Sequence, residues 1–300
     1  MERIELQNGL SLSRIIYGMW RLGDDENTSA SHVQAKIEAC LAQGITSFDQ
    51  ADIYGNYECE LLLGKALKAT PALRNEMQII TKCDINLLSP KYPDRKVKHY
   101  DTSAAHITDS VNTSLKNMAI DCIDVLLLHR PDPLMDADET AQALDALIAA
   151  GKVKSVGVSN FMHWDWTLLQ ASLNAKLVTN QIELSLLENQ YFTDGTVAYL
   201  QERGIAPMAW SPLGGGRIFN DKCERTEKLR NALATSANDH GVEIDAIAVA
   251  WLLRHPSRIM PVMGTNNLDR IQKLSSALEV KMSREEWFVL LEAANGVEVA

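Results

Sequence analysis

The chain has 300 residues, 46% of them hydrophobic and 23% charged, and its formal net charge is -10. This length allows a large buried core, and the acidic balance without a Lys/Arg cluster argues against a nucleic-acid surface. There is no apolar run of about 18 residues and no apolar segment near the N-terminus, so we expect neither a membrane span nor a signal peptide.

The first predicted element is a β-hairpin at the N-terminus. Apolar and polar residues alternate on both sides of Asn8-Gly9, with Ile4 and Leu6 before it and Leu10 and Leu12 after it. Asn-Gly suits the positive φ angles of a two-residue type I′ turn.

Eight short apolar runs then alternate with segments of helical period. Several of these segments end in a glycine, as at Gly44, Gly151 and Gly204, which is typical of a helix C-terminus. Repeated strand–helix units predict a parallel sheet, and eight of them predict a single-domain (β/α)8 TIM barrel over residues 1–300 with the hairpin as a cap. The expected strands are Arg14–Tyr17, Thr46–Phe48, Met77–Thr81, Ile123–Leu128, Val153–Val158, Val178–Ile182, Ile205–Trp210 and Ile259–Met263.

A doubly wound sheet is the competing fold. It requires a G-x-G-x-x-G turn after the first strand, and "YGMWRLGDD" does not provide one. Two intervals of the barrel are longer than usual, residues 83–101 and 211–224. Both should open at the carboxyl ends of their strands, and long loops without structure of their own are often lids.

Polar residues follow the strands at the end where barrel active sites lie. Asp49 and Tyr54 follow the second strand, Lys82 the third and His129 the fourth. A buried Lys82 beside Asp49 should keep its charge, and a cation near Tyr54 should lower the pKa of the phenol. Tyr54 could then protonate a carbonyl oxygen, while His129 hydrogen-bonds that oxygen or relays a proton.

These residues lie within a longer series of motifs that covers nearly the whole chain and resembles the aldo-keto reductase superfamily. The nearest likeness is to the bacterial YdhF-like oxidoreductases, which carry a segment like "GMWRLG". The resemblance implies a catalytic tetrad of Asp49, Tyr54, Lys82 and His129. The matching motifs are "DQADIYG", "ITK", "LLLHRPD", "GVSNF", "NQIELS", "AWSPLGGG" and "PVMGTNNLDRI".

The resemblance also implies a nicotinamide cofactor site. Ser159, Asn160 and Gln181 match contacts to the carboxamide, and Trp210 matches the aromatic residue that stacks on the nicotinamide ring. A pyrophosphate loop is implied at Ser211, Pro212, Leu213, Gly214, Gly215 and Gly216, followed by Arg217. Other contacts are expected from Trp20, Arg21, Gly264, Thr265, Asn266 and Arg270.

Thr265 and Arg270 match contacts to a 2′-phosphate, for which arginine is the better bidentate partner. The lysine usual in this segment is absent, because Gly264 and Asn267 occupy its two expected places. NADPH is therefore the expected cofactor, and the use of NADH stays open. No His/Asp/Glu cluster or C-x-x-C spacing suggests a metal, and the five cysteines fit reduced thiols in the cytoplasm.

The leading hypothesis is an NADP(H)-dependent reductase of small-molecule aldehydes or ketones. Two alternatives stay open: a Schiff-base lyase or aldolase that uses Lys82, and a nicotinamide-binding regulatory subunit with little turnover. We expect no nucleic-acid or membrane partner, and a monomer or a weak homo-oligomer. The short sequence after the last expected helix, Ser283–Asn295, predicts an open substrate pocket.

Overall fold

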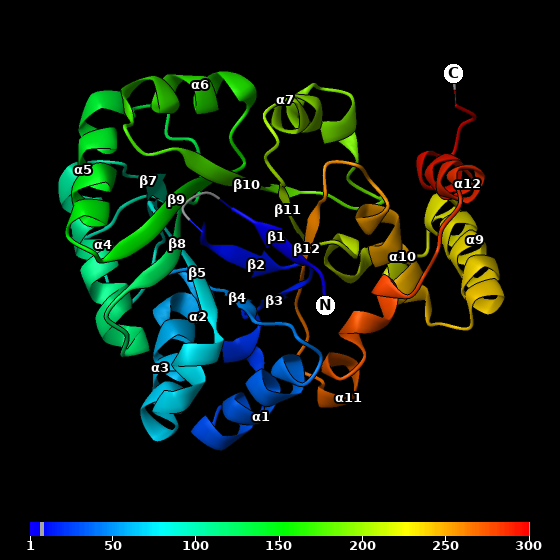
Figure 1. Ribbon diagram of the computed structural model, residues 1–300, viewed down its shortest axis with the longest axis horizontal. Helices are drawn as coiled ribbons and strands as arrows, with labels where there is room; N and C mark the ends of the chain where they lie inside the picture. The colour runs from blue at the N-terminus through cyan, green and yellow to red at the C-terminus, as the bar shows by residue number, and fades with distance from the viewer. Residues whose placement is uncertain (7–8, 300) are drawn as a thin grey trace.

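The computed structural model, which describes residues 1–6 and 9–299, is a closed barrel of eight strands surrounded by helices (Figure 1). Neighbouring strands are parallel and follow one another in chain order, and the pairing of the last strand with the first closes the barrel. The predicted TIM barrel is confirmed. Its strands are β3 (Ile16–Gly18), β4 (Ser47–Asp49), β5 (Gln78–Cys83), β8 (Ile123–Leu128), β9 (Val153–Ser159), β10 (Leu177–Glu183), β11 (Met208–Trp210) and β12 (Met260–Met263).

The N-terminal hairpin closes the amino end of the barrel. β1 (Arg3–Glu5) and β2 (Ser11–Ser13) pair antiparallel, with Ile4 opposite Leu12. Both side chains are buried in one cluster with apolar residues from inside the barrel, and Figure 1 shows the hairpin lying across this end. The predicted cap is therefore confirmed. The expected turn at Asn8-Gly9 includes Asn8, which lies outside the described residues, whereas Gly9 has a φ of +72°.

The helices begin and end where side-chain chemistry favours it. Ser29, Ser103, Asp136 and Ser283 accept hydrogen bonds from the backbone N–H groups of the turns that follow them, which satisfies donors otherwise left free. The helices are α1 (Ala30–Leu41), α2 (Tyr54–Tyr57), α3 (Cys59–Ala69), α4 (Ala104–Met118), α5 (Ala137–Ala149), α6 (His163–Ser172), α7 (Thr196–Glu202), α8 (Arg217–Asn220), α9 (Glu224–His240), α10 (Ile244–Leu253), α11 (Leu268–Ile271) and α12 (Arg284–Asn295).

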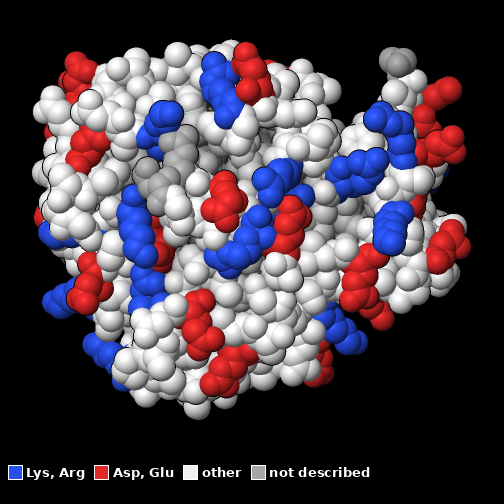
Figure 2. Space-filling view, in the orientation of Figure 1, with Lys and Arg blue, Asp and Glu red and all other residues white. Residues whose placement is uncertain are grey.

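Two apolar layers stabilise the molecule: one inside the barrel and one between the strands and the surrounding helices. α9 and α12 form an extension at one side of the ring (Figure 1). Lys and Arg side chains are interspersed with Asp and Glu on the face that carries the hairpin (Figure 2). Among residues 1–6 and 9–299, no helix combines the length and apolar character needed to cross a bilayer.

The two long intervals carry short elements of their own. Residues 83–101 contain β6 (Ile85–Asn86) and β7 (His99–Tyr100), which pair antiparallel. Residues 211–224 contain a 3-10 turn, Gly214–Gly216, and then α8. Both segments do leave from the carboxyl ends of their strands, β5 and β11.

Candidate active site

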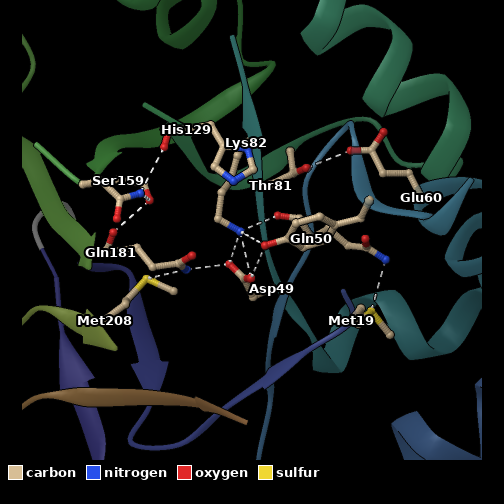
Figure 3. A network of polar contacts seen from close by, with 12 residues as sticks. Met19, Asp49, Gln50, Glu60, Thr81, Lys82, His129, Ser159, Gln181 and Met208 are labelled. Atoms are coloured by element: carbon tan, nitrogen blue, oxygen red, sulfur yellow. Dashed lines mark hydrogen bonds and ion pairs between the residues drawn. The ribbon is translucent and has the colours of Figure 1, made fainter. Parts of the chain in front are cut away.

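A buried ion pair lies at the carboxyl end of the barrel. Lys82 Nζ donates hydrogen bonds to both carboxylate oxygens of Asp49, each at 2.8 Å, and to the carbonyl oxygen of Gln50 at 2.8 Å (Figure 3). Lys82 is 0% exposed and Asp49 2% exposed. Because adjacent parallel strands end at the same edge, the positions of these residues on β4 and β5 are enough to bring them together.

Tyr54 joins this pair from the first position of α2. Its phenol oxygen accepts a hydrogen bond from Lys82 Nζ at 2.9 Å and lies 3.5 Å from Asp49 Oδ2. Three of the four expected tetrad residues therefore form one polar cluster.

The pKa of Tyr54 is shifted in the direction opposite to the prediction. Burial raises it well above 10, and the negative charge of Asp49 raises it further. Burial also lowers the pKa of Lys82, although Asp49 counters part of this effect. Burial and the negative charge of Asp49 thus determine the shift, and the strand pattern alone did not reveal their size. The consequence is a phenol that stays protonated at neutral pH and can act as a proton donor.

His129 follows β8 and completes the expected tetrad. Its ring meets the Tyr54 ring edge-on, with centroids 6.0 Å apart and an interplanar angle of 76°. Burial lowers the pKa of His129 well below 6.5, and the charges of Lys82, Arg130 and Lys98 lower it further. Nδ1 of this neutral imidazole is buried without a hydrogen-bond partner. A neutral ring can direct an N–H group at a substrate oxygen.

The residues expected to hold a nicotinamide carboxamide form a chain of hydrogen bonds. Trp210 Nε1 donates to Asn160 Oδ1 at 3.0 Å, Asn160 Nδ2 donates to Ser159 Oγ at 2.8 Å, and Ser159 Oγ donates to the Gln181 carbonyl at 2.8 Å. Gln181 Nε2 also donates to Asp49 Oδ1 at 2.7 Å (Figure 3). Gln181 thus links the chain to the tetrad, a contact that the sequence did not predict.

The glycine loop after β11 forms an open backbone turn. Gly214, Gly215 and Gly216 have φ angles of 61°, 66° and 96°, a region that glycine adopts without strain. A Cβ at Gly215 would meet no atom within 4 Å, so the space beside the backbone is free. Arg217, expected to contact the cofactor, donates from Nε to the Gly214 carbonyl and pairs with Glu188 at 2.7 Å. In this structure Arg217 therefore secures the loop.

The segments that follow β3 and β12 are joined near the expected 2′-phosphate site. Tyr17 Oη donates to the Thr265 carbonyl at 2.8 Å, and Asn266 Nδ2 donates to the Arg21 carbonyl at 2.6 Å. Gly264 and Arg270 are exposed beside this junction. Trp20 is 53% exposed, with the Arg21 guanidinium 5.0 Å from its ring centroid.

Lys36 on α1 also reaches this junction, although the sequence analysis did not single it out. It is fully buried, pairs with Asp25 and donates to Asn266 Oδ1 at 3.0 Å. The helical spacing could have indicated its burial, because Lys36 falls on the same helical face as Val33, Ile37 and Cys40, all of them buried.

Two further cations near the tetrad were missed. Arg130 follows His129 directly, and its guanidinium lies 5.7 Å from the Trp210 ring centroid. Lys98 lies in the 83–101 segment, and its charge acts on His129. The position of Arg130 in "LLLHRPD" was a usable signal, whereas Lys98 lies too far along the chain for the strand pattern to place it.

The described residues contain no group of three or more His, Cys, Asp or Glu side chains able to hold a metal ion. The candidate site therefore combines an acid–base cluster, a hydrogen-bonded row of side chains from Gln181 to Trp210, and a glycine loop that follows Trp210 in the chain. Such a row can accept a long ligand with a polar ring at one end and phosphates at the other.

Comparisons with known proteins agree with this geometry. The family model described as "Aldo/keto reductase family" matches residues 14–294. The chain is 57% identical to a 6-dehydroglucose reductase of Agrobacterium fabrum over 300 residues, all of both chains. It is 43% identical to the oxidoreductase YdhF of Escherichia coli over 292 residues, covering 97% of this chain and 96% of that protein.

Solved structures show the same fold. A thermostable aldo-keto reductase in complex with the inhibitor epalrestat has a TM-score of 0.82 and 24% identity, with 98% of this chain and 100% of that one covered. An aldo/keto reductase from Klebsiella pneumoniae in complex with NADP and acetate has a TM-score of 0.78 and 22% identity, with 96% and 93% covered. On the family model and these relatives, the chain belongs to the aldo-keto reductase family.

Proposed function

We propose that the protein reduces an aldehyde or ketone to an alcohol with NADPH, and that Tyr54 is the proton donor. The observation that carries the proposal is the cluster at the barrel's carboxyl end, where Lys82 Nζ lies 2.9 Å from Tyr54 Oη and 2.8 Å from Asp49. The raised pKa of Tyr54 keeps its proton in place until a carbonyl oxygen accepts it.

The residues present fit a nicotinamide dinucleotide. Ser159, Asn160 and Gln181 offer amide and hydroxyl groups for a carboxamide, and Trp210 offers a flat face for the ring. The open turn at Gly214–Gly216 fits a pyrophosphate, and exposed Arg270 fits a 2′-phosphate. Bound NADPH would supply the hydride. Klebsiella pneumoniae proteins of the same fold have been solved with NADP and with NADPH, which supports this assignment.

Each tetrad residue then has one role. Tyr54 protonates the substrate oxygen, and Lys82 stabilises the phenolate that remains. Asp49 holds Lys82 in place through both of its carboxylate oxygens. Neutral His129 directs a hydrogen bond at the same substrate oxygen and so orients the carbonyl group.

The substrate class follows from two relatives. Proteins 57% and 37% identical to this chain are described as 6-dehydroglucose reductases. We therefore propose a sugar aldehyde, and 6-dehydroglucose is the first compound to test. Arg130 and Lys98 beside His129 support this choice, because both are hydrogen-bond donors suited to hydroxyl groups.

The Schiff-base alternative is disfavoured by the surroundings of Lys82. Its amine is 0% exposed and donates hydrogen bonds to Asp49, Gln50 and Tyr54, so it acts here as a buried cation and not as a free nucleophile. The regulatory alternative is decided by measuring turnover.

The first test is a titration with NADPH and NADH followed by nicotinamide fluorescence. We expect tighter binding of NADPH, and Arg270→Ala should weaken NADPH by about tenfold or more while leaving NADH within about twofold. Exposed Arg284 at the start of α12 provides a matched control, Arg284→Ala. An assay with 6-dehydroglucose and simpler aldehydes follows. Failure to bind either nucleotide, or binding without reduction of any carbonyl, would contradict the proposal.

A further inference from the structure

The backbone directly after Tyr54 forms an unusual left-handed turn. Gly55, Asn56 and Tyr57 have φ angles of 57°, 55° and 69°. A Cβ at Gly55 would lie 2.6 Å from Cys59 Sγ, so glycine is required there for space as well as conformation. Asn tolerates the left-handed region better than most residues, but an aromatic residue such as Tyr57 rarely adopts it. The turn therefore needs contacts from elsewhere to persist.

The 83–101 segment supplies those contacts through the side chain of Tyr57. Tyr57 Oη accepts hydrogen bonds from the Leu87 N–H at 2.9 Å and from Arg95 at 2.7 Å. Arg95 also donates to the Leu87 carbonyl at 3.3 Å, which ties the segment to itself. The ring of Tyr92 meets that of Tyr57 edge-on at 5.0 Å, and the Arg95 guanidinium lies 3.7 Å from the Tyr92 ring centroid.

The same segment also holds the backbone of the turn. Lys91 Nζ donates to the Tyr57 carbonyl at 3.1 Å and pairs with Glu58 at 2.5 Å. The segment has a fixed base, because β6 pairs with β7 and the Asp101 N–H donates to the Asp84 carbonyl at 2.9 Å. It begins at Cys83, the residue after Lys82. The contacts to the turn thus start from the strand that carries the tetrad lysine.

We propose that Arg95 and Tyr57 are positioning residues that keep Tyr54 at its catalytic distance from Lys82, with residues 83–101 acting as a clamp on the turn. The inference rests on the proposed role of Tyr54 as proton donor. Only two residues separate Tyr54 from Tyr57, so release of the turn moves the phenol away from its 2.9 Å contact. A displacement of about 1 Å is enough to lower a catalytic rate by as much as about 100-fold.

The test compares two arginines that make similar contacts. Arg95→Ala removes the clamp, whereas Arg203→Ala removes a guanidinium that lies 3.6 Å from the Tyr199 ring centroid on α7, where we place no catalytic residue. We expect Arg95→Ala to lower kcat by about tenfold or more, with the NADPH Kd and the substrate KM within about threefold. Tyr57→Phe, which loses only the hydroxyl, should lower kcat by about threefold or more. Arg203→Ala should leave kcat unchanged.

Crystal structures of the two alanine variants provide a readout independent of turnover. In Arg95→Ala, Asn56 or Tyr57 should leave the positive-φ region, and the distance from Tyr54 Oη to Lys82 Nζ should increase. An unchanged turn and distance, or an unchanged kcat, would overturn the inference. If the wild type reduces no carbonyl but the turn still changes in the Arg95→Ala structure, the proposed function is rejected and the clamp is retained. If Arg95→Ala and Arg203→Ala lose kcat equally, the effect is general and the clamp is rejected.

Discussion

The two ends of the barrel differ in how completely their buried polar groups are hydrogen-bonded. At the amino end, Asp124 is 1% exposed and accepts hydrogen bonds from Arg74 at 2.8 Å, Lys154 at 2.7 Å and the Ile79 N–H at 2.8 Å. A cleft of about 440 Å³ opens there, but Arg74 and Lys154 in its lining are already paired. Groups whose hydrogen bonds are satisfied in this way stabilise the fold and have little left to offer a ligand.

At the carboxyl end, buried polar atoms are left without partners. They include His129 Nδ1, Asp52 Oδ1, Asp84 Oδ1 and Gln50 Oε1, whereas Ser155 Oγ, near the start of β9, is such an atom at the amino end. Strained backbone is also more frequent there, since Asn56, Tyr57, Asp84, Asn160 and Ser211 have positive φ, compared with Ala119 and Arg258 at the amino end. Unsatisfied groups and strain reduce stability, and they persist where function requires them. The comparison therefore locates the active site better than the volume of a cleft does.

Among the variants that test this difference between the two ends, Tyr54→Phe should have the largest effect. It removes the proton donor while Lys82 keeps its contacts with Asp49 and Gln50, so the fold should be retained. We expect kcat for carbonyl reduction to fall by about 100-fold to 10,000-fold, measured as NADPH oxidation. The NADPH Kd should change by less than about twofold, because no proposed cofactor contact is lost. Turnover close to that of the wild type would contradict the role of Tyr54.

The next largest effect should come from a variant at the amino end. It should lower the free energy of unfolding and leave catalysis unchanged. Asp124→Ala leaves Arg74 without its carboxylate and the buried Ile79 N–H without an acceptor. We expect the free energy of unfolding to fall by about 3 kcal/mol, measured by urea denaturation. kcat/KM at a temperature where the variant is folded should stay within about twofold of the wild type.

Arg258→Ala is the matched control at the same end of the barrel. Arg258 pairs with Glu2 at 3.1 Å, both side chains are about half exposed, and Glu2 keeps its pair with buried Arg14 when Arg258 is removed. An exposed pair contributes about 0–1 kcal/mol, so this variant should be nearly neutral. A large loss of kcat/KM in Asp124→Ala would show that the two ends are not separable in function.

Strand positions could be predicted from the sequence because each strand is a short apolar run next to a segment of helical period, and several of these segments end in a glycine. All eight runs became strands of the barrel. The structure of the 83–101 segment could not be predicted in this way. β6 and β7 are two residues long, and irregular backbone without a periodic pattern separates them in the chain.

The tetrad could be predicted because parallel strands end at one edge, so that Asp49 and Lys82 had to meet. The direction of the Tyr54 pKa shift could not, because it depends on burial and on the negative charge of Asp49. The contact of Gln181 with Asp49 was equally out of reach, since β10 and β4 lie across the barrel from one another.

A smaller effect should appear in the pH dependence of the free energy of unfolding, and it should come from His129 at the carboxyl end. The pKa of His129 in the folded protein is well below 6.5, so the unfolded chain binds the proton more readily. The stability due to the neutral ring is fully present above about pH 6.5 and is lost as pH falls below that value. Between about pH 7.5 and pH 5, the wild type should lose about 2 kcal/mol more than His129→Gln. Urea denaturation at both pH values measures the difference, and equal losses would contradict the buried, neutral state of His129.

The smallest effect should come from Trp210→Phe, which keeps an aromatic ring but removes the Nε1–H that donates to Asn160 Oδ1 at 3.0 Å. One neutral hydrogen bond contributes about 1 kcal/mol, so NADPH binding should weaken by about threefold to tenfold. Stability should hardly change, because Trp210 is partly exposed. If the variant instead unfolds more easily while binding NADPH normally, the hydrogen-bond chain supports the barrel. Polar groups at the carboxyl end would then contribute to the free energy of unfolding, as those at the amino end do.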